Sequence, residues 1–289
     1  NTLEEIRIRI GQPVIFHMEN EEWYLKKETG RLERSQVNAY CATKEDIKSM
    51  VKFISSYSLY AYEDEMKRGF ITMQGGHRIG VAGQVVMDGG KVLSLSNIYF
   101  LNIRVAREKR GCAKDIIPYL IHRNNIYNTL FVSPPGIGKT TYLRDAIRIL
   151  SNGSDRLHGM KISIIDERSE IAACRQGIPQ NDIGIRSDVL DGCLKSFGML
   201  LMLRSMAPQI IAVDEIGSRE DCRAMEQAIY SGSRIIGTVH AYDMKELSRK
   251  KYLKEMLEQQ MFGRIVLLEK AENGRRRFHI YDENLEKIC

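Results

Sequence analysis

The eight residues Ser133–Thr140, S-P-P-G-I-G-K-T, constrain the fold more than any other part of this sequence. The apolar run Leu130–Val132 before them is typical of a buried strand, and the apolar spacing within 142–150 predicts a helix after them. Strand, glycine-containing turn, Lys-Thr and helix are the layout of a phosphate-binding P-loop. The sequence therefore predicts an α/β chain that binds a nucleotide.

The residue types of this loop suit a phosphate group. Glycines at 136 and 138 permit backbone angles that direct N–H groups toward one oxyanion, and the following helix directs its positive dipole end to the same place. Lys139 is expected to neutralise the β- and γ-phosphates of ATP, and the Thr140 hydroxyl to hold Mg²⁺. Ser133 stands where the usual pattern has its first glycine. The expected ATP-binding residues are Ser133, Pro134, Pro135, Gly136, Ile137, Gly138, Lys139, Thr140 and Thr141.

Length and composition indicate a soluble globular chain. Its 289 residues suit one or two domains, with 43% hydrophobic and 28% charged residues. The net charge of +6 permits a basic patch but does not require one. The six cysteines lie far apart, which predicts isolated reduced thiols and no zinc site. The apolar run 198–203 is too short to span a bilayer.

The pattern of apolar residues divides the chain near residue 125. Residues 1–124 show short mixed elements, including an alternating strand over 4–10 and a helix that starts at Thr43, and predict a small α+β domain. Residues 125–289 alternate strands and helices, which predicts a mainly parallel sheet in a RecA/AAA-like P-loop ATPase domain. Strands are expected at 127–133, 161–166, 209–214, 234–239 and 264–269, the last opening a C-terminal hairpin that turns at 272–274.

Acidic residues follow two of the expected strands. The strand at 209–214 ends in Asp214 and Glu215, the Walker B form, in which Asp214 holds Mg²⁺ through water and Glu215 orients or deprotonates the attacking water. The strand at 161–166 ends in Asp166 and Glu167. Ligands sit at the carboxyl ends of strands in open α/β sheets, so we expect these side chains at the site. Glu170 either joins them or caps a following helix.

A histidine ends a third expected strand. His240 follows the apolar run that ends at Val239, and it lies after the phosphate loop in the same predicted sheet. We expect it to contact the γ-phosphate or to fix the catalytic glutamate.

A P-loop followed by these strand ends, in this order, resembles the ATPase family of type II and type IV secretion and pilus motors. The resemblance assigns Ser133–Thr140 to the Walker A motif, Asp166–Glu170 to the Asp box, Ile210–Glu215 to Walker B and Gly237–His240 to the His box. It implies Mg²⁺-dependent ATP hydrolysis and a homo-hexameric ring.

The N-terminal part resembles a branch of that family that acts in endospore formation. The motifs are Ser56–Tyr62, Gly69–Thr72, Gly75–Gly83 and Leu101–Arg107. This resemblance implies a cytoplasmic ATPase on the mother-cell side of the forespore membrane, which powers a secretion-like channel. The implied partner is a membrane-embedded sporulation component, and no nucleic acid is expected.

Phosphoryl transfer also requires positive charge near the γ-phosphate. The candidates are Arg104 and Arg107, which the family resemblance favours because N-terminal arginines there close over the nucleotide, and Arg204 before Walker B. Each of them is otherwise an ordinary surface arginine.

Two other functions stay open at this point. A nucleic-acid-dependent ATPase would use the basic run 275–277 and Gly76–Arg78 to bind phosphates, although the sequence lacks basic residues interleaved with aromatic ones. A nucleotide-regulated assembly scaffold would bind ATP without turning it over. Stimulation of hydrolysis by single-stranded nucleic acid, or the absence of hydrolysis, distinguishes these functions from a secretion-type motor.

Overall fold

The computed structural model describes residues 3–19, 21–54, 62–67, 69–154, 157–271 and 275–289. The chain divides into two compact units, Asn1–Arg107 and Glu108–Cys289. The predicted boundary after residue 124 falls later than this division, because Ala113, Ile116 and Leu120 are buried in the core of the second unit. Two sequence predictions, the 56–61 part of the motif Ser56–Tyr62 and the turn at 272–274, lie outside the described residues.

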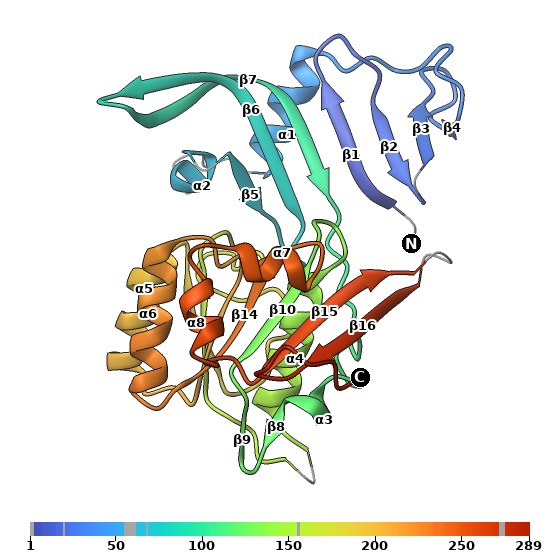
Figure 1. Ribbon diagram of the computed structural model, residues 1–289. Coiled ribbons are helices and arrows are strands. Elements are labelled where there is room, and N and C mark those ends of the chain that lie inside the picture. Colours follow the sequence, from blue (N-terminus) through green and yellow to red (C-terminus); the bar gives the residue numbers. More distant parts are fainter. Residues whose placement is uncertain (1–2, 20, 55–61, 68, 155–156, 272–274) are drawn as a thin grey trace. The chain divides into compact units, whose positions relative to one another are not determined.

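The N-terminal unit has an antiparallel sheet in the order β4-β3-β2-β1-β7-β6-β5, with helices α1 and α2 (Figure 1). Helix α1 begins where the sequence predicts, because the Thr43 hydroxyl accepts from the Asp46 N–H at 3.2 Å and the Asp46 carboxylate accepts from the Thr43 N–H at 2.7 Å. The elements are β1 (Leu3–Arg9), β2 (Ile15–Met18), β3 (Glu21–Leu25), β4 (Leu32–Glu33), α1 (Lys44–Ile54), α2 (Glu63–Lys67), β5 (Phe70–Thr72), β6 (Arg78–Asp88) and β7 (Lys91–Arg104).

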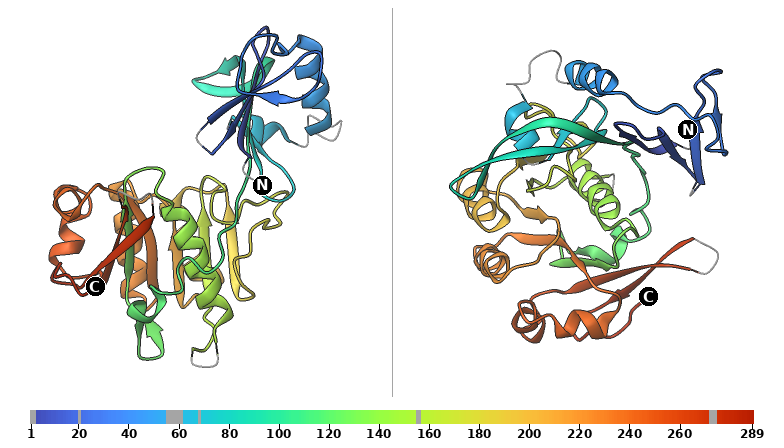
Figure 2. Two further views of the ribbon diagram at one scale, coloured as in Figure 1. Left: turned by 90° about the vertical axis from the view of Figure 1, so that its right-hand side faces the viewer. Right: turned by 90° about the horizontal axis from the view of Figure 1, so that it is seen from above.

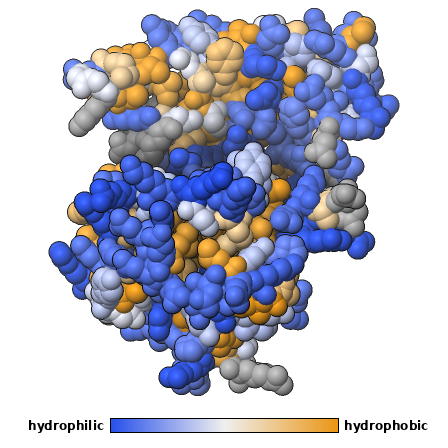
Figure 3. All heavy atoms as spheres, viewed as in Figure 1, coloured by the Kyte–Doolittle hydropathy of each residue, from blue (hydrophilic) through white to orange (hydrophobic). Residues whose placement is uncertain are grey.

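The far half of the β6–β7 hairpin is an apolar arm. Strand β7 pairs with β1 over Phe100–Arg104, and β6 pairs with β5 over Arg78–Gly80. Within the described part of the chain, the strand residues between 83 and 98 pair only with each other. Apolar side chains cover this part of the surface (Figure 3). The exposed ones are Val85, Val86, Met87 and Leu93.

The second unit has a sheet in the order β12-β11-β13-β14-β10-β15-β16, in which β16 alone of these strands pairs antiparallel. A separate short pair, β8 and β9, precedes it. The elements are α3 (Ile117–Leu120), β8 (Ile121–His122), β9 (Asn125–Ile126), β10 (Thr129–Ser133), α4 (Lys139–Asn152), β11 (Ile162–Asp166), β12 (Ser187–Asp191), α5 (Lys195–Ser205), β13 (Ile210–Val213), α6 (Arg219–Tyr230), β14 (Arg234–His240), α7 (Met244–Arg249), α8 (Lys254–Glu258), β15 (Arg264–Lys270) and β16 (Arg276–Tyr281).

Helices cover both faces of this sheet, because successive side chains of a strand point to opposite faces. In β10, Phe131 packs into the cluster that includes Leu143 and Ile147 of α4. Its neighbours Leu130 and Val132 pack on the other face, in the cluster that contains residues of α5, α6, α7 and α8. The result is a three-layer α/β/α unit (Figure 2). The predicted fold class is confirmed.

The predicted strands of this unit are confirmed within a few residues at each end, and the hairpin is β15–β16. Strand β12 was not predicted. Its sequence, S-D-V-L-D, has too few apolar residues for a buried strand, and it occupies the edge of the sheet beside β11.

All six cysteines are free thiols. None of the described helices combines the length with the apolar character that a bilayer crossing requires.

Truncating the α4 side of the core should destabilise the second unit. Leu143 is fully buried. Leu143→Ala is expected to lower the free energy of unfolding by about 2–5 kcal/mol, since it removes apolar contacts and leaves a cavity. Leu201→Ala, on α5 where the side chain is 42% exposed, is the matched control and should lose less than about 1 kcal/mol. Equal losses in urea denaturation would contradict the packing described.

Candidate active site

The P-loop joins β10 to α4 through a turn that requires glycine. Gly136 has φ = 79° and Gly138 has φ = 108°. A residue with a Cβ atom would be strained at these positive φ angles, whereas glycine adopts them freely. Gly138 is the N-cap of α4, so the first N–H groups of that helix have no partner within it. Ser133, in place of the usual glycine, is buried and donates its hydroxyl to the Pro134 carbonyl at 2.7 Å. Its polar group is therefore satisfied within the loop.

The Lys139 amine lies between the P-loop and His240. Its Nζ donates to the Ser133 carbonyl at 3.2 Å and lies 2.8 Å from His240 Nδ1. Burial lowers the pKa of Lys139, while the charges of Asp214 and Glu215 oppose that shift. The amine thus lies at the P-loop, beside the two acids whose charges favour its protonated form.

Thr140 and Asp214 form the polar pair expected to hold Mg²⁺. The Thr140 hydroxyl donates to Asp214 Oδ2 at 2.8 Å. The other oxygen, Oδ1, accepts from the Glu215 N–H at 3.0 Å and from the Thr238 hydroxyl. A hydroxyl and one carboxylate, next to a phosphate-binding loop, are the hard oxygen ligands that Mg²⁺ takes together with substrate phosphates. The residues present fit this ion.

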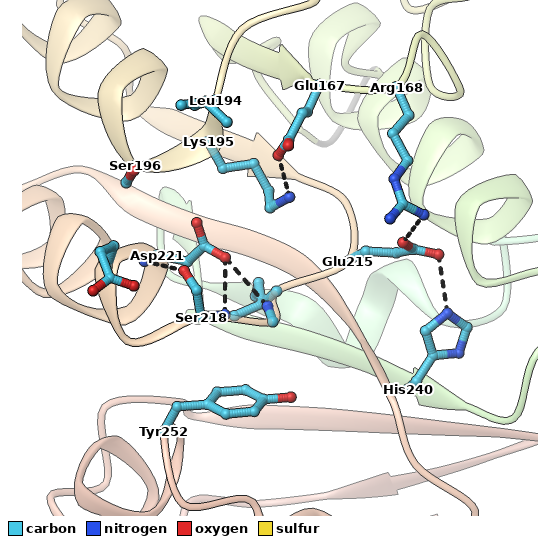
Figure 4. A pocket seen from close by; sticks show the side chains of 13 residues that line it. Glu167, Arg168, Leu194, Lys195, Ser196, Glu215, Ser218, Asp221, His240 and Tyr252 are labelled. Carbon is cyan, nitrogen blue, oxygen red and sulfur yellow. Dashed lines mark hydrogen bonds and ion pairs between the residues drawn. The ribbon is translucent and has the colours of Figure 1, made fainter. Parts of the chain in front are cut away.

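Glu215 is held at both carboxylate oxygens. Its backbone has φ = 47°, uncommon for a residue with a side chain. Its Oε1 lies 3.0 Å from His240 Nε2, and its Oε2 pairs with Arg168 (Figure 4). Burial raises the pKa of Glu215, but the hydrogen bond from His240 and the charge of Arg168 outweigh it and hold the pKa below its ordinary value. The carboxylate is therefore ionised at neutral pH.

His240 connects the phosphate loop to Glu215. Its Nδ1 faces the Lys139 amine, which can only donate, and its Nε2 faces the Glu215 carboxylate, which accepts. These contacts suit a ring that accepts at Nδ1 and donates at Nε2. The expectation that His240 fixes the glutamate agrees with these contacts.

A cavity of about 490 Å³ opens beside Glu215 and His240. Glu167, which the sequence placed at this rim, pairs there with Lys195 at the start of α5 (Figure 4). Tyr252 lines the same cavity from the segment before α8. The structure thus brings Glu167 to the sheet edge, but its contact is with Lys195.

Asp166 does not line the cavity beside Glu215 and His240, so the expectation that its side chain faces the site needs correction. It is buried, and its carboxylate accepts from the backbone N–H groups of Glu170, Ile171 and Ala172 at 2.8–3.0 Å. Burial raises the pKa of Asp166 to about 6, although these three hydrogen bonds lower it. Its carboxyl supports the loop that carries Arg168. Glu170 caps no helix, because a turn follows β11.

Each candidate arginine is described within its own unit, and the sequence analysis did not propose Arg168. In the N-terminal unit, Arg104 lies 3.8 Å from Glu5 and Arg107 lies 3.5 Å from Glu4. Arg204 is exposed in the last turn of α5. Arg168 directly follows the acidic pair at the end of β11. This position could have indicated Arg168 from the sequence, because a strand end at the edge of the site can carry a cationic side chain as readily as an acidic one.

Two of the basic residues considered for nucleic acid, His77 and Arg78, make contacts within the N-terminal unit. His77 Nδ1 accepts from the Ala106 N–H at 3.0 Å. The guanidinium of Arg78 lies 3.6 Å from the centre of the Phe70 ring, a cation–π contact.

The parallel sheet, the P-loop and the strand-end carboxylates together define a P-loop α/β fold, which solved ATPase structures share. The crystal structure of the pilus retraction motor PilT with bound ADP matches 96% of this chain and 78% of its own, with a TM-score of 0.64 and 16% identity. The ATPase DotB of Legionella pneumophila matches 96% of this chain and 76% of its own, with a TM-score of 0.57 and 17% identity.

The sequence comparisons are more specific. The chain belongs to the family described as sporulation stage III, protein AA, because that family's model matches residues 1–288. Stage III sporulation protein AA of Bacillus subtilis (strain 168) is 40% identical over 282 residues, which cover 98% of this chain and 87% of that protein.

The buried Asp166 makes stability depend on pH in a defined direction. Its folded-state pKa of about 6 exceeds the ordinary 3.8. Between these values the folded chain keeps a proton that the unfolded chain releases, so its contribution to stability is full below the ordinary pKa and is lost as pH rises through the folded-state value.

Asp166→Asn removes this titrating carboxyl group. The free energy of unfolding of the wild type, relative to the variant, should therefore fall as pH rises from about 4 to about 7. Urea denaturation of both proteins across this range measures it. A difference that stays constant with pH would contradict the assignment.

Proposed function

We propose that this chain hydrolyses Mg²⁺-ATP and thereby powers a secretion-like channel complex during endospore formation. One observation carries the proposal: His240 contacts both the P-loop lysine and the strand-end glutamate, at 2.8 and 3.0 Å. A phosphate-binding group and an ionised carboxylate are thus joined at one sheet edge, as ATP hydrolysis requires.

The P-loop binds the phosphates of ATP in this proposal. Its N–H groups and the Lys139 ammonium supply positive charge to the phosphates, and Thr140 and Asp214 would hold Mg²⁺. When bound, Mg²⁺ neutralises charge on the phosphate oxygens. Thr238 holds Asp214 through the same oxygen that accepts from the Glu215 N–H, which fixes the two acids relative to each other.

Glu215 acts on the attacking water. Its carboxylate accepts a proton from the water while the water oxygen bonds to the γ-phosphorus and the bond from that phosphorus to the ADP oxygen breaks. The proton then passes to the released phosphate. His240 orients Glu215 through Oε1, and Arg168 holds Oε2 while placing a positive charge near the reacting group.

The proposal also includes a motor role, a ring assembly and a membrane partner. The named activities of PilT, a pilus retraction motor, and DotB, an ATPase, support a motor role. The name of the Bacillus subtilis relative supports a place in sporulation. We assign this chain to a homo-hexameric ring on the cytoplasmic, mother-cell side of the forespore membrane, coupled to a membrane-embedded partner.

Removing the base should abolish turnover but not binding. Glu215→Gln is expected to lower kcat about 10²–10⁴-fold with little change in KM for ATP, because the amide cannot take a proton. Lys139→Ala should instead weaken ATP binding, since it removes the loop cation. Phosphate release and ATP-analogue binding measure the two effects.

Glu258→Gln on α8 is the matched control, because that carboxylate is exposed and pairs with Lys254. It should hydrolyse ATP like the wild type. A wild type that binds ATP without releasing phosphate would identify a scaffold, and unchanged turnover in Glu215→Gln would exclude this base.

Arg168 should lower the pKa of Glu215 and thereby the pH of the acid limb of the kcat–pH profile. Its charge helps to hold the pKa of Glu215 below the ordinary value. In Arg168→Gln that pKa rises, so the acid limb of the kcat–pH profile, which reports ionised Glu215, moves to higher pH. Arg249→Gln, an exposed change on α7, should leave the limb in place. An unmoved limb in Arg168→Gln would show that the ion pair does not tune the base.

A further inference from the structure

Strand β16 directs one of its arginines to the face of the sheet that α4 covers. Phe278 and Ile280 pack with the α4 core cluster. Side chains two residues apart on a strand share a face, so Arg276 points the same way. Arg277 points to the opposite face, which also carries Tyr281 in the other cluster.

The guanidinium of Arg276 lies against the P-loop. A Cβ atom built on Gly138 would be 3.0 Å from Nη1, 3.1 Å from Cζ and 3.2 Å from Nη2 of Arg276. Three atoms of the planar group at nearly equal distances mean that it faces the glycine. Gly138 directly precedes Lys139, so the arginine reaches the loop from the β16 side.

A second observation places the same charge at the start of α4. Burial raises the pKa of Tyr142, in the first turn of that helix, and the charge of Arg276 opposes this shift. Among the contacts of the described residues, no ion pair joins Arg276 to a carboxylate, and its side chain is exposed. Its donors are therefore available to a ligand at the loop.

We infer that Arg276 binds the phosphate groups of the nucleotide held at the P-loop. A guanidinium offers paired N–H donors that match two phosphate oxygens, and it is charged at every working pH. Lys139 and Arg276 then supply two cations from separate elements, α4 and β16. The inference rests on the proposed function only for nucleotide binding at this loop, and it does not require hydrolysis.

This placement also divides the basic run 275–277. Because successive residues of β16 face opposite sides, Arg276 and Arg277 do not form one basic surface. Arg277 stands opposite Glu269 in the strand register. The run therefore provides one arginine to the P-loop, and Arg277 gives a matched control on the same strand.

Direct binding of ADP tests the inference without turnover. Isothermal titration calorimetry of the full chain with Mg²⁺-ADP should show at least about tenfold weaker binding in Arg276→Gln, the loss of one charge-assisted contact. Arg277→Gln should bind within about twofold of the wild type. Arg276→Lys, which keeps the charge but not the paired donors, should lie between them.

The salt dependence separates a phosphate contact from a structural effect. The difference in ADP affinity between the wild type and Arg276→Gln should shrink as the salt concentration rises. Salt screens the attraction between Arg276 and the phosphates, which only the wild type has. Arg276→Gln that binds ADP like the wild type, or a deficit that does not change with salt, would overturn the inference. A wild type that binds neither ADP nor ATP would instead contradict the proposed function.

Discussion

The parallel pairing of β14 between β10 and β13 is the constraint on which the whole site depends. Its register sets Ser133 opposite His240 and Val213 opposite Gly237. The P-loop, the Walker B acids and the histidine therefore emerge at the same edge, although more than a hundred residues separate the first from the last. His240 stands between the other two and contacts both, so Lys139, His240 and Glu215 form one hydrogen-bonded unit.

A second layer of contacts fixes the loop after β11. Asp166 accepts from three backbone N–H groups of this loop, and Arg144 of α4 donates to the Ile171 carbonyl at 2.6 Å. These buried contacts hold the loop on both sides, and from its start Arg168 extends to Glu215. The buried Asp166 thus supports the loop that carries Arg168, and the charge of Arg168 helps to hold the pKa of Glu215 below its ordinary value.

Much of the fold could be predicted from the sequence, because the patterns that indicate strands, helices and the P-loop are local. The P-loop pattern predicted the β10–α4 turn, and apolar runs ending in polar residues located β11, β13 and β14. Orientation is not a local property: Asp166 and Asp214 both end apolar strands, yet one carboxylate turns into its own loop and the other faces Thr140. The contact of Arg276 with the P-loop depends on the packing of distant elements, so its sequence neighbours could not reveal it. The position of Arg168 after the acidic pair indicated the sheet edge but not its partner Glu215. Strand β12 was missed because an edge strand needs few apolar residues.

The central claim is that this sheet edge is a single ATP-hydrolysing centre, and a crystal structure with Mg²⁺ and a non-hydrolysable ATP analogue tests it most directly. The account predicts the triphosphate along the P-loop, with Lys139 at the phosphates, Mg²⁺ beside Thr140 and Asp214, and the Glu215 carboxylate facing the γ-phosphate. An analogue bound away from the loop, or a Glu215 carboxylate turned from the γ-phosphate in the bound state, would contradict it.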